Sequence, residues 1–260
     1  SAASDVYKRQ LMALFGLYFY VYNLRQGYPY LYYTLSAITI IFMIAVPILT
    51  MRSFAEDRKN KTDQLMLTAP VPVAKIVLGK YLAMLAVFTV DIAVFCVTPL
   101  ILRAFGTIPM GESYIAILAF WLYGAASIAV GMFISALTES QVIAAVLTFV
   151  VLFISYMMQS LTGLISSDGN WLTKILNCLD LYAPFEKFQG GCLDITAILY
   201  YVTVIVLFNF FTVQAIQKRR WSISKKTFSL SVFSSSFIVV VLALAVVANL
   251  AVDALPTRIT

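Results

Sequence analysis

The chain has 260 residues, of which 62% are hydrophobic and only 12% are charged, and its mean hydropathy is +0.91. Soluble domains carry about 25% charged residues, so the composition excludes an ordinary soluble protein and indicates an integral membrane protein. The net charge of +6 does not indicate nucleic-acid binding, because the basic residues lie beside apolar segments, where they report membrane topology.

Several classes of catalytic and metal site are excluded by residue content. The sequence has no histidine, which removes His-based acid–base catalysis, His metal ligands and Ser-His-Asp triads. Cys96, Cys178 and Cys192 lack the spacing of a metal site, although a disulfide between the last two stays open. Neither nucleotide-binding glycine motif occurs. These patterns predict no metal site and no nucleotide bound through either glycine motif.

Apolar segments of membrane-spanning length follow one another along the chain. Residues 1–10 are polar and differ in character from the apolar segment after them, so we expect a non-native leader. Transmembrane helices are predicted at about 11–24, 30–50, 76–102, 113–137, 141–164 and 195–216, with a seventh at about 228–252. The first would rise only about 21 Å, so it either extends into residues 6–10 or lacks its native start. The predicted fold is an all-α polytopic membrane protein, a six-helix bundle plus a seventh C-terminal helix.

Residues 51–72 form the longest charged island between two of these spans. Since chain order alternates the two sides of the membrane, the basic residues can be assigned to sides. The side of the island holds Lys8, Arg9, Arg52, Arg58, Lys59, Lys61, Lys75, Lys80, Lys218, Arg219, Arg220, Lys225 and Lys226, against Arg25, Arg103, Lys174, Lys187 and Arg258 on the other. This asymmetry places the island in the cytoplasm.

The island has the pattern of a short capped helix. Residues 53–59 can continue the preceding helix out of the membrane. Thr62 is a candidate N-cap, and prolines at 70 and 72 end the turn. A helix over about 62–68 would expose Leu65, Met66 and Leu67, which need a cover. A plain connector, a segment lying on the bilayer and a docking surface for a soluble partner all remain open from this pattern.

Three stretches resemble one family. The run TMRSFAEDRKNKTDQLMLTAPVPVAKIVLGKYLAML is similar to a loop of bacterial ABC-2 type transporter permeases, especially the gliding-motility-associated branch. GMFISALTESQVIAA (131–145) resembles their tight turn between spans four and five. FEKFQGGCLDITAILYY (185–201) resembles their approach to span six, through Phe185, Phe188, Gly191 and Asp194. The similarity covers about residues 11–221. Many relatives have Gly before the loop threonine and Glu after it, where this chain has Lys61 and Asp63.

The resemblance implies a permease half of an ABC exporter in the bacterial plasma membrane, with no enzymatic activity of its own. A separate ATP-binding subunit, which holds ATP and Mg²⁺, would dock on a coupling helix in loop 51–75, and a second permease copy or homologue would complete the transporter. The implied docking residues are Arg52, Phe54, Glu56, Asp57, Arg58, Thr62, Leu65, Met66, Leu67 and Pro70. Residues 222–260 resemble the anchor of an extracytoplasmic companion subunit, so they are either the start of a fused companion or a simple extra helix.

Two further features are candidates inside the spans. Asp91 is an acidic residue deep in a span, which suggests an ion relay or a polar contact between helices or subunits. Gly124, Ser127 and Gly131 give span four a face of small residues for close packing. Two alternatives to the exporter remain: an ion-coupled secondary transporter, and a membrane anchor that transports nothing.

Overall fold

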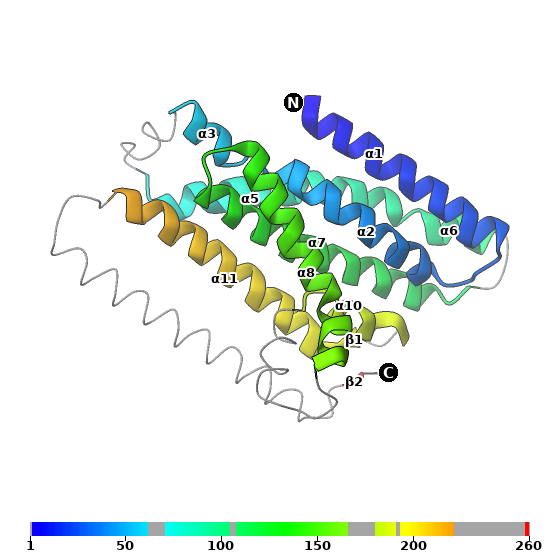
Figure 1. The fold of residues 1–260 in the computed structure, drawn as a ribbon. Helices are drawn as coiled ribbons and strands as arrows, with labels where there is room; N and C mark the ends of the chain where they lie inside the picture. Colours follow the sequence, from blue (N-terminus) through cyan, green and yellow to red (C-terminus); the bar gives the residue numbers. More distant parts are fainter. Residues whose placement is uncertain are drawn as a thin grey trace.

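The computed structural model describes residues 2–61, 71–104, 108–165, 180–190, 193–220 and 258–259. Within these ranges the chain is a helical bundle (Figure 1), and the β structure there is one antiparallel pairing of β1, Leu193–Asp194, with β2, Arg258–Ile259. Five described helices are long and apolar enough to cross a membrane. The predicted all-α polytopic class is therefore confirmed. The count of six plus one stays a prediction, since residues 228–252 lie outside the described ranges.

The five candidate spans are Leu31–Lys59, Val73–Arg103, Met110–Leu137, Gln141–Met158 and Ile195–Gln217. They correspond to the second to sixth predicted helices. They are built from α2 (Leu31–Thr50) with α3 (Ala55–Lys59), α5 (Val73–Phe95) with α6 (Thr98–Arg103), α7 (Met110–Leu137), α8 (Gln141–Ile165) and α11 (Ile195–Arg220).

The first predicted span lies in a longer helix. Helix α1, Ala2–Phe19, continues into a π-helix, Tyr20–Arg25, so residues 2–10 precede the predicted span without a break. At its end the buried Asn23 accepts a hydrogen bond from Thr34 Oγ1 (2.5 Å) and donates one to the carbonyl of Tyr28 (2.9 Å). These bonds fix the turn into α2, in which Gly27 takes the left-handed φ of 71°.

The third predicted span, 76–102, is divided in the structure. Helix α5 ends at Phe95 and α6 begins at Thr98, with Pro99 in its first turn. Proline has no N–H and its ring clashes with the carbonyl four residues earlier, here that of Phe95. That carbonyl instead accepts a hydrogen bond from Thr98 Oγ1 at 2.7 Å. The predicted span therefore corresponds to the candidate span Val73–Arg103, which is made of two helices, α5 and α6.

Helix α7 lies at the centre of the bundle, where it contacts α2, α5, α8 and α11. Its small residues permit close approach. A Cβ atom on Gly124 would lie 2.3 Å from a ring carbon of Phe88, and one on Gly131 would lie 2.5 Å from Thr50 Oγ1. Ser127, between them, is buried and donates to the carbonyl of Tyr123 (2.8 Å).

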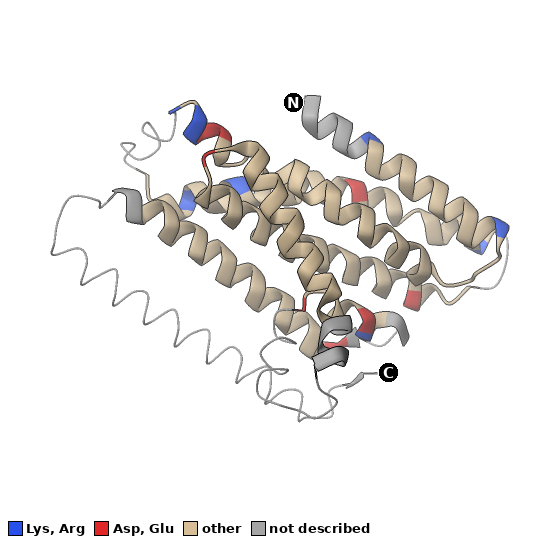
Figure 2. Cartoon of the chain, viewed as in Figure 1, with Lys and Arg blue, Asp and Glu red and all other residues tan. Residues whose placement is uncertain are grey.

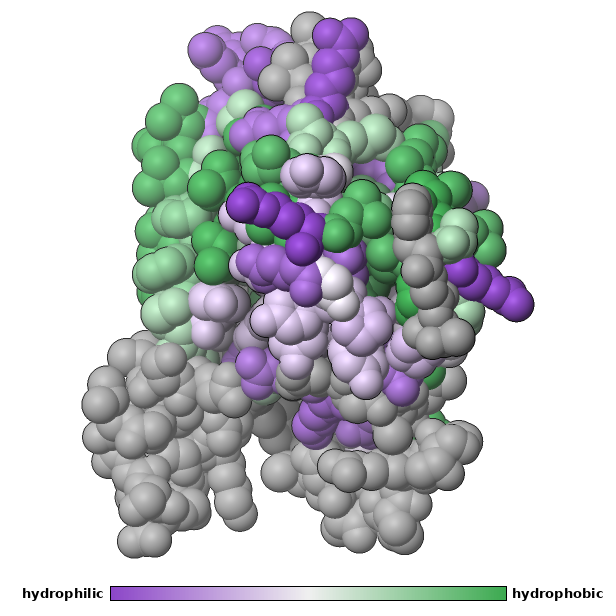
Figure 3. Space-filling view, turned by 90° about the vertical axis from the view of Figure 1, so that its right-hand side faces the viewer, coloured by the Kyte–Doolittle hydropathy of each residue, from purple (hydrophilic) through white to green (hydrophobic). Residues whose placement is uncertain are grey.

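Apolar side chains also cover the outside of the bundle. Helix α8 exposes Val142, Ile143, Val146, Val150 and Ile154, as expected for a surface that faces lipid. Charged residues lie mostly near helix ends, with a cluster on α3 (Figure 2). Seen from the right-hand side of Figure 1, hydrophilic residues occupy the centre of the face and hydrophobic residues flank it (Figure 3).

Candidate functional site at the base of the charged loop

The charged island begins with a sharp junction between α2 and α3. Helix α2 ends at Thr50, whose carbonyl accepts a hydrogen bond from the N–H of Ser53 (3.0 Å), and α3 starts at Ala55. The first turn of α3 carries Glu56 and Asp57, and its last turn carries Arg58 and Lys59. This order suits the helix dipole, which favours acids at the N-terminus and bases at the C-terminus.

Helix α3 ends in a left-handed residue. Lys61 has a φ of 58°, the one such value at a non-glycine position within the described ranges. Its N–H donates to the carbonyl of Arg58 at 3.0 Å, which closes the last turn. Glycine is the usual residue at a helix end of this kind because a Cβ atom disfavours positive φ. The position is also the one at which many ABC-2 permeases, by the resemblance in the sequence, carry glycine.

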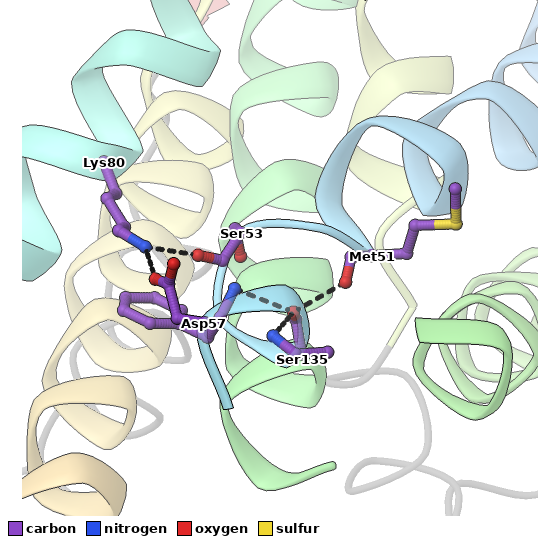
Figure 4. A network of polar contacts seen from close by, with 7 residues as sticks. Met51, Ser53, Asp57, Lys80 and Ser135 are labelled. Carbon is purple, nitrogen blue, oxygen red and sulfur yellow. Dashed lines mark hydrogen bonds and ion pairs between the residues drawn. The ribbon is translucent and has the colours of Figure 1, made fainter. Parts of the chain in front are cut away.

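A serine from α7 caps the N-terminus of α3. Ser135 Oγ accepts hydrogen bonds from the N–H groups of Phe54 and Ala55, each at 3.2 Å, and donates to the carbonyl of Met51 at 3.2 Å (Figure 4). A hydroxyl has one donor and two acceptor sites, so its full capacity is used. The N-cap residue of α3 is Phe54, whose ring cannot accept these bonds. The cap is therefore supplied from a helix about 80 residues further along the chain.

A lysine from α5 holds the other side of α3. Lys80 Nζ donates to the carbonyl of Ser53 and forms an ion pair with Asp57 (Figure 4). The same ammonium lies 4.5 Å from the ring centroid of Phe54, a cation–π contact. Both ion-pair side chains are about a quarter exposed, so the pair alone would contribute little. Lys80 matters because its ammonium joins α5 to the start of α3 through three contacts, with Ser53, Asp57 and Phe54.

We call Met51, Ser53, Phe54, Ala55, Asp57, Lys80 and Ser135 the loop junction. The predicted docking residues divide around it. Arg52 is exposed, Glu56 and Arg58 are half-buried, and Phe54 is buried beneath Lys80. Thr62, Leu65, Met66, Leu67 and Pro70 lie outside the described residues, so the coupling helix at 62–68 stays a prediction.

The other predicted residues lie away from this junction. Asp91 is fully buried in α5, one turn before Phe95, whose ring stacks on Phe15 of α1 at 3.7 Å. Asp194 caps α11 by accepting hydrogen bonds from Thr196 N (3.0 Å) and Thr196 Oγ1 (2.6 Å).

Phe185 and Phe188 are buried in the segment before α11, whereas Gly191 lies outside the described residues. In the part of the chain that the structure describes, no group of three or more His, Cys, Asp or Glu could hold a metal ion.

The two side chains that fasten α3 to other helices, those of Lys80 and Ser135, were not predicted from the sequence. Lys80 lies inside the predicted third span. A charged ammonium group within a membrane span needs a polar partner, so its position in the span could have identified Lys80 as a candidate. Ser135 gave no signal, because serine is common among the small residues of a packed helix.

Residues 9–189 match the family model described as "ABC-2 family transporter protein", which is more than two thirds of the chain. The chain belongs to the ABC-2 transporter family. The matched part of this ABC-2 protein includes the charged island and all residues of the loop junction, and it ends within the segment before α11. Searches of curated proteins and of solved structures gave no match.

Family membership identifies a multi-pass membrane component of a transporter, a class that is generally non-catalytic. It supports the resemblance seen in the sequence at the level of the ABC-2 membrane domain. The gliding-motility-associated branch and the fusion to a companion subunit remain predictions.

Proposed function

We propose that this ABC-2 protein is the permease subunit of an ABC exporter and that loop 51–75 receives a separate ATP-binding subunit. The observation that carries the proposal is the loop junction. The base of the loop is fastened to α7 through Ser135 and to α5 through Lys80. A loop held in this way can pass force to the membrane helices, whereas a loose connector cannot.

The direction of force follows from the packing. A partner that pushes on the loop displaces α3, and α3 cannot move without the ends of α2, α5 and α7 because the junction ties it to all three. Helix α7 contacts α2, α5, α8 and α11, so its displacement reaches most of the bundle. Switching by rigid elements of this kind is common in proteins that alternate between two states.

The chemistry is divided between the subunits. ATP and Mg²⁺ are bound by the partner, and this chain provides the docking surface and the pathway. Leu65, Met66 and Leu67 of the predicted coupling helix supply the packing surface, while Arg52, Glu56, Asp57 and Arg58 supply polar contacts at its base. The asymmetry of basic residues supports a cytoplasmic loop, and the resemblance to ABC-2 permeases supports the bacterial plasma membrane. A second permease copy or homologue completes the pathway, and the segment at 228–252 anchors an extracytoplasmic companion.

The test is a charge substitution on the docking surface. Leu65→Asp is expected to reduce binding of the ATP-binding subunit at least tenfold in a pull-down from detergent, and to abolish ATP-dependent transport. Insertion into the membrane should be unchanged. Leu137→Asp is the matched control, because Leu137 is an exposed leucine at the end of α7 on the same side of the bundle. It should leave partner binding within about twofold.

The outcomes separate the exporter from its alternatives. Transport that persists without the ATP-binding subunit but collapses with the proton gradient would establish an ion-coupled secondary transporter. A bound ATP-binding subunit with no movement of solute or lipid would establish a membrane anchor. Equal binding by Leu65→Asp and Leu137→Asp would remove residues 62–68 from the interface.

A further inference from the structure

A buried side-chain amide in α11 has an oxygen atom without a hydrogen-bond partner. Asn209 is 7% exposed, and its Nδ2 donates to the carbonyl of Ile205 one turn earlier (2.8 Å). This bond fixes which way the amide is turned. Oδ1 is then left without a partner in the part of the chain that the structure describes. Native proteins contain few buried polar atoms of this kind, because each one destabilises the fold, so this oxygen calls for a physical explanation.

The position of Asn209 in the membrane makes the unpaired oxygen unfavourable. Asn209 is the fifteenth of the 26 residues of α11, so it lies about 21 Å from the start of that helix at 1.5 Å per residue. Water is absent from the hydrocarbon region at this depth, and polar groups there are satisfied by protein. Helix α11 contacts α7 and α5. A donor for the oxygen should therefore come from one of these two helices.

Tyr81 of α5 is a buried hydroxyl donor that can change its acceptor. It is 5% exposed, and its Oη donates to the carbonyl of Ala125 on α7 (3.1 Å). Since Ala125 lies inside a continuous helix, the same carbonyl also accepts the N–H of Ala129, four residues later. The tyrosine hydroxyl can therefore leave this carbonyl without creating an unpaired backbone group.

Contacts along α7 place the hydroxyl-bearing residue and the amide at similar heights in the bundle. Phe88 of α5 packs on Gly124 of α7. Tyr81 precedes Phe88 by seven residues, so it lies about 10 Å nearer the charged loop. Phe133 follows Gly124 by nine residues, about 13 Å nearer the loop, and its ring lies 5.7 Å from that of Phe208, the residue before the amide. The two heights differ by about 3 Å.

The tyrosine also follows directly after a residue of the loop junction. Lys80 holds Ser53 and Asp57 at the base of the charged loop (Figure 4). A force on the loop base therefore acts on α5 one residue away from Tyr81. The bond from Tyr81 to Ala125 crosses from α5 to α7, so it is sensitive to any shift of these two helices against each other.

We infer that Tyr81 and Asn209 form a hydrogen-bond latch that distinguishes two states of the transporter. In the resting state, which this structure describes, Tyr81 Oη bonds to the carbonyl of Ala125 and Asn209 Oδ1 is unpaired. When the ATP-binding subunit displaces the loop, α5 moves with it and the hydroxyl transfers to Oδ1. The new bond ties α5 to α11 and satisfies the buried oxygen, which stabilises the second state. The inference rests on the proposed transport function.

The test compares the thermal midpoint of unfolding in the two states. The resting protein is the chain alone in detergent, and the second state is its complex with the ATP-binding subunit, trapped with ATP and vanadate. Asn209→Leu replaces the amide with an apolar side chain of similar size. It should raise the resting midpoint by about 2–4 °C, because the unpaired oxygen is removed. It should lower the midpoint of the trapped complex by about 2–4 °C, because a hydrogen bond is lost there.

Thr212→Val is the matched control. Thr212 is fully buried one turn further along α11, and its hydroxyl donates to the carbonyl of Phe208 (2.8 Å) in the resting protein. Because this hydroxyl is already bonded within its own helix, the substitution should shift both midpoints in the same direction. Gel filtration confirms that each variant is folded.

A second variant tests the identity of the donor. Tyr81→Phe removes the hydroxyl and should lower both midpoints. Its effect should add to that of Asn209→Leu in the resting protein, where the two groups are not bonded to each other. In the trapped complex the double variant should be no less stable than the less stable single variant, because both substitutions remove the same bond. Additive losses in the trapped complex would overturn the latch.

The remaining outcomes separate the latch from the proposed function. A lower resting midpoint for Asn209→Leu would show that Oδ1 already has a partner, such as an ordered water, and a shift of the same sign in both states would show that the residue only packs the core. Either result, in a protein whose transport depends on ATP, would refute the latch alone. Absence of ATP-dependent transport by the unsubstituted protein would refute the exporter and the latch with it.

Discussion

Removal of the Ser135 hydroxyl gives the sharpest test of the loop junction. Ser135→Ala deletes the acceptor for the N–H groups of Phe54 and Ala55 and the donor to the carbonyl of Met51. An unsatisfied buried group costs about 1–3 kcal/mol, and loss of a helix N-cap costs about 1 kcal/mol. The bonds from Phe54 and Ala55 are buried, and the bond to Met51 is partly buried. We therefore expect a loss of about 2 kcal/mol.

The assay has two readouts. The free energy of unfolding in detergent should fall by about 2 kcal/mol, and the amount of solute moved per ATP hydrolysed should fall severalfold while the ATP-binding subunit still binds. The second readout separates a junction that transmits force from one that only stabilises the fold. Ser127→Ala is the matched control, because Ser127 is equally buried in α7 but donates only to its own helix, at the carbonyl of Tyr123. Equal effects of the two substitutions on both readouts would refute the junction.

Three further predictions concern stability. Lys61→Gly should raise the free energy of unfolding by about 1 kcal/mol because glycine accepts the φ of 58° without strain. Lys59→Gly, inside α3, should lower the free energy of unfolding. A melting experiment in which the Lys59→Gly variant is the more stable of the two would contradict this. Gly131→Ala should cost about 1–3 kcal/mol through its clash with Thr50, whereas Gly79→Ala, with no atom within 4 Å, should be neutral or stabilising in the same assay. Burial, with the nearby Glu186 acting in the same direction, raises the pKa of the Asp180 carboxyl. Its raised value favours the protonated folded state, so this contribution to stability is present at low pH and is lost as pH rises through the folded pKa. Asp180→Asn keeps the Oδ1 acceptor and should remove that dependence, which unfolding midpoints measured from acidic to neutral pH will show.

The membrane helices were accessible from the sequence because each is a long apolar run bounded by charges, glycine or proline. The predicted spans at 30–50 and 141–164 correspond to α2 and α8 almost residue for residue. The sequence pattern did not show where the backbone changes direction within a span. Pro99 divides the third span into α5 and α6, and a hydropathy pattern does not register the clash that causes the break.

The contacts of the candidate site were beyond the sequence for a different reason. Ser135 and Lys80 act on residues 23 to 84 positions away, and helix packing alone decides which face meets α3. The burial of Leu181, Tyr182 and Phe185 was missed because a polar and aromatic loop between spans has the composition of a surface segment at the membrane interface. Its burial depends on four helices that supply hydroxyls and rings at matching heights, and no local pattern encodes that match.

Helix α7 joins the base of the charged loop to the aromatic centre of the bundle. It carries Ser135, which caps the base of the charged loop, and also Phe120 and Tyr123, which contact the ring of Phe185 before α11. Twelve to fifteen residues separate these points, or about 18–22 Å of helix. Close-packed interiors deform little and shift between discrete arrangements. Gly131 of α7 packs closely against Thr50 of α2, so the two helices have no free space between them at this contact. A displacement that a partner imposes on the loop therefore reaches the middle of the bundle through one buried rigid helix, so a separate relay of side chains is not required.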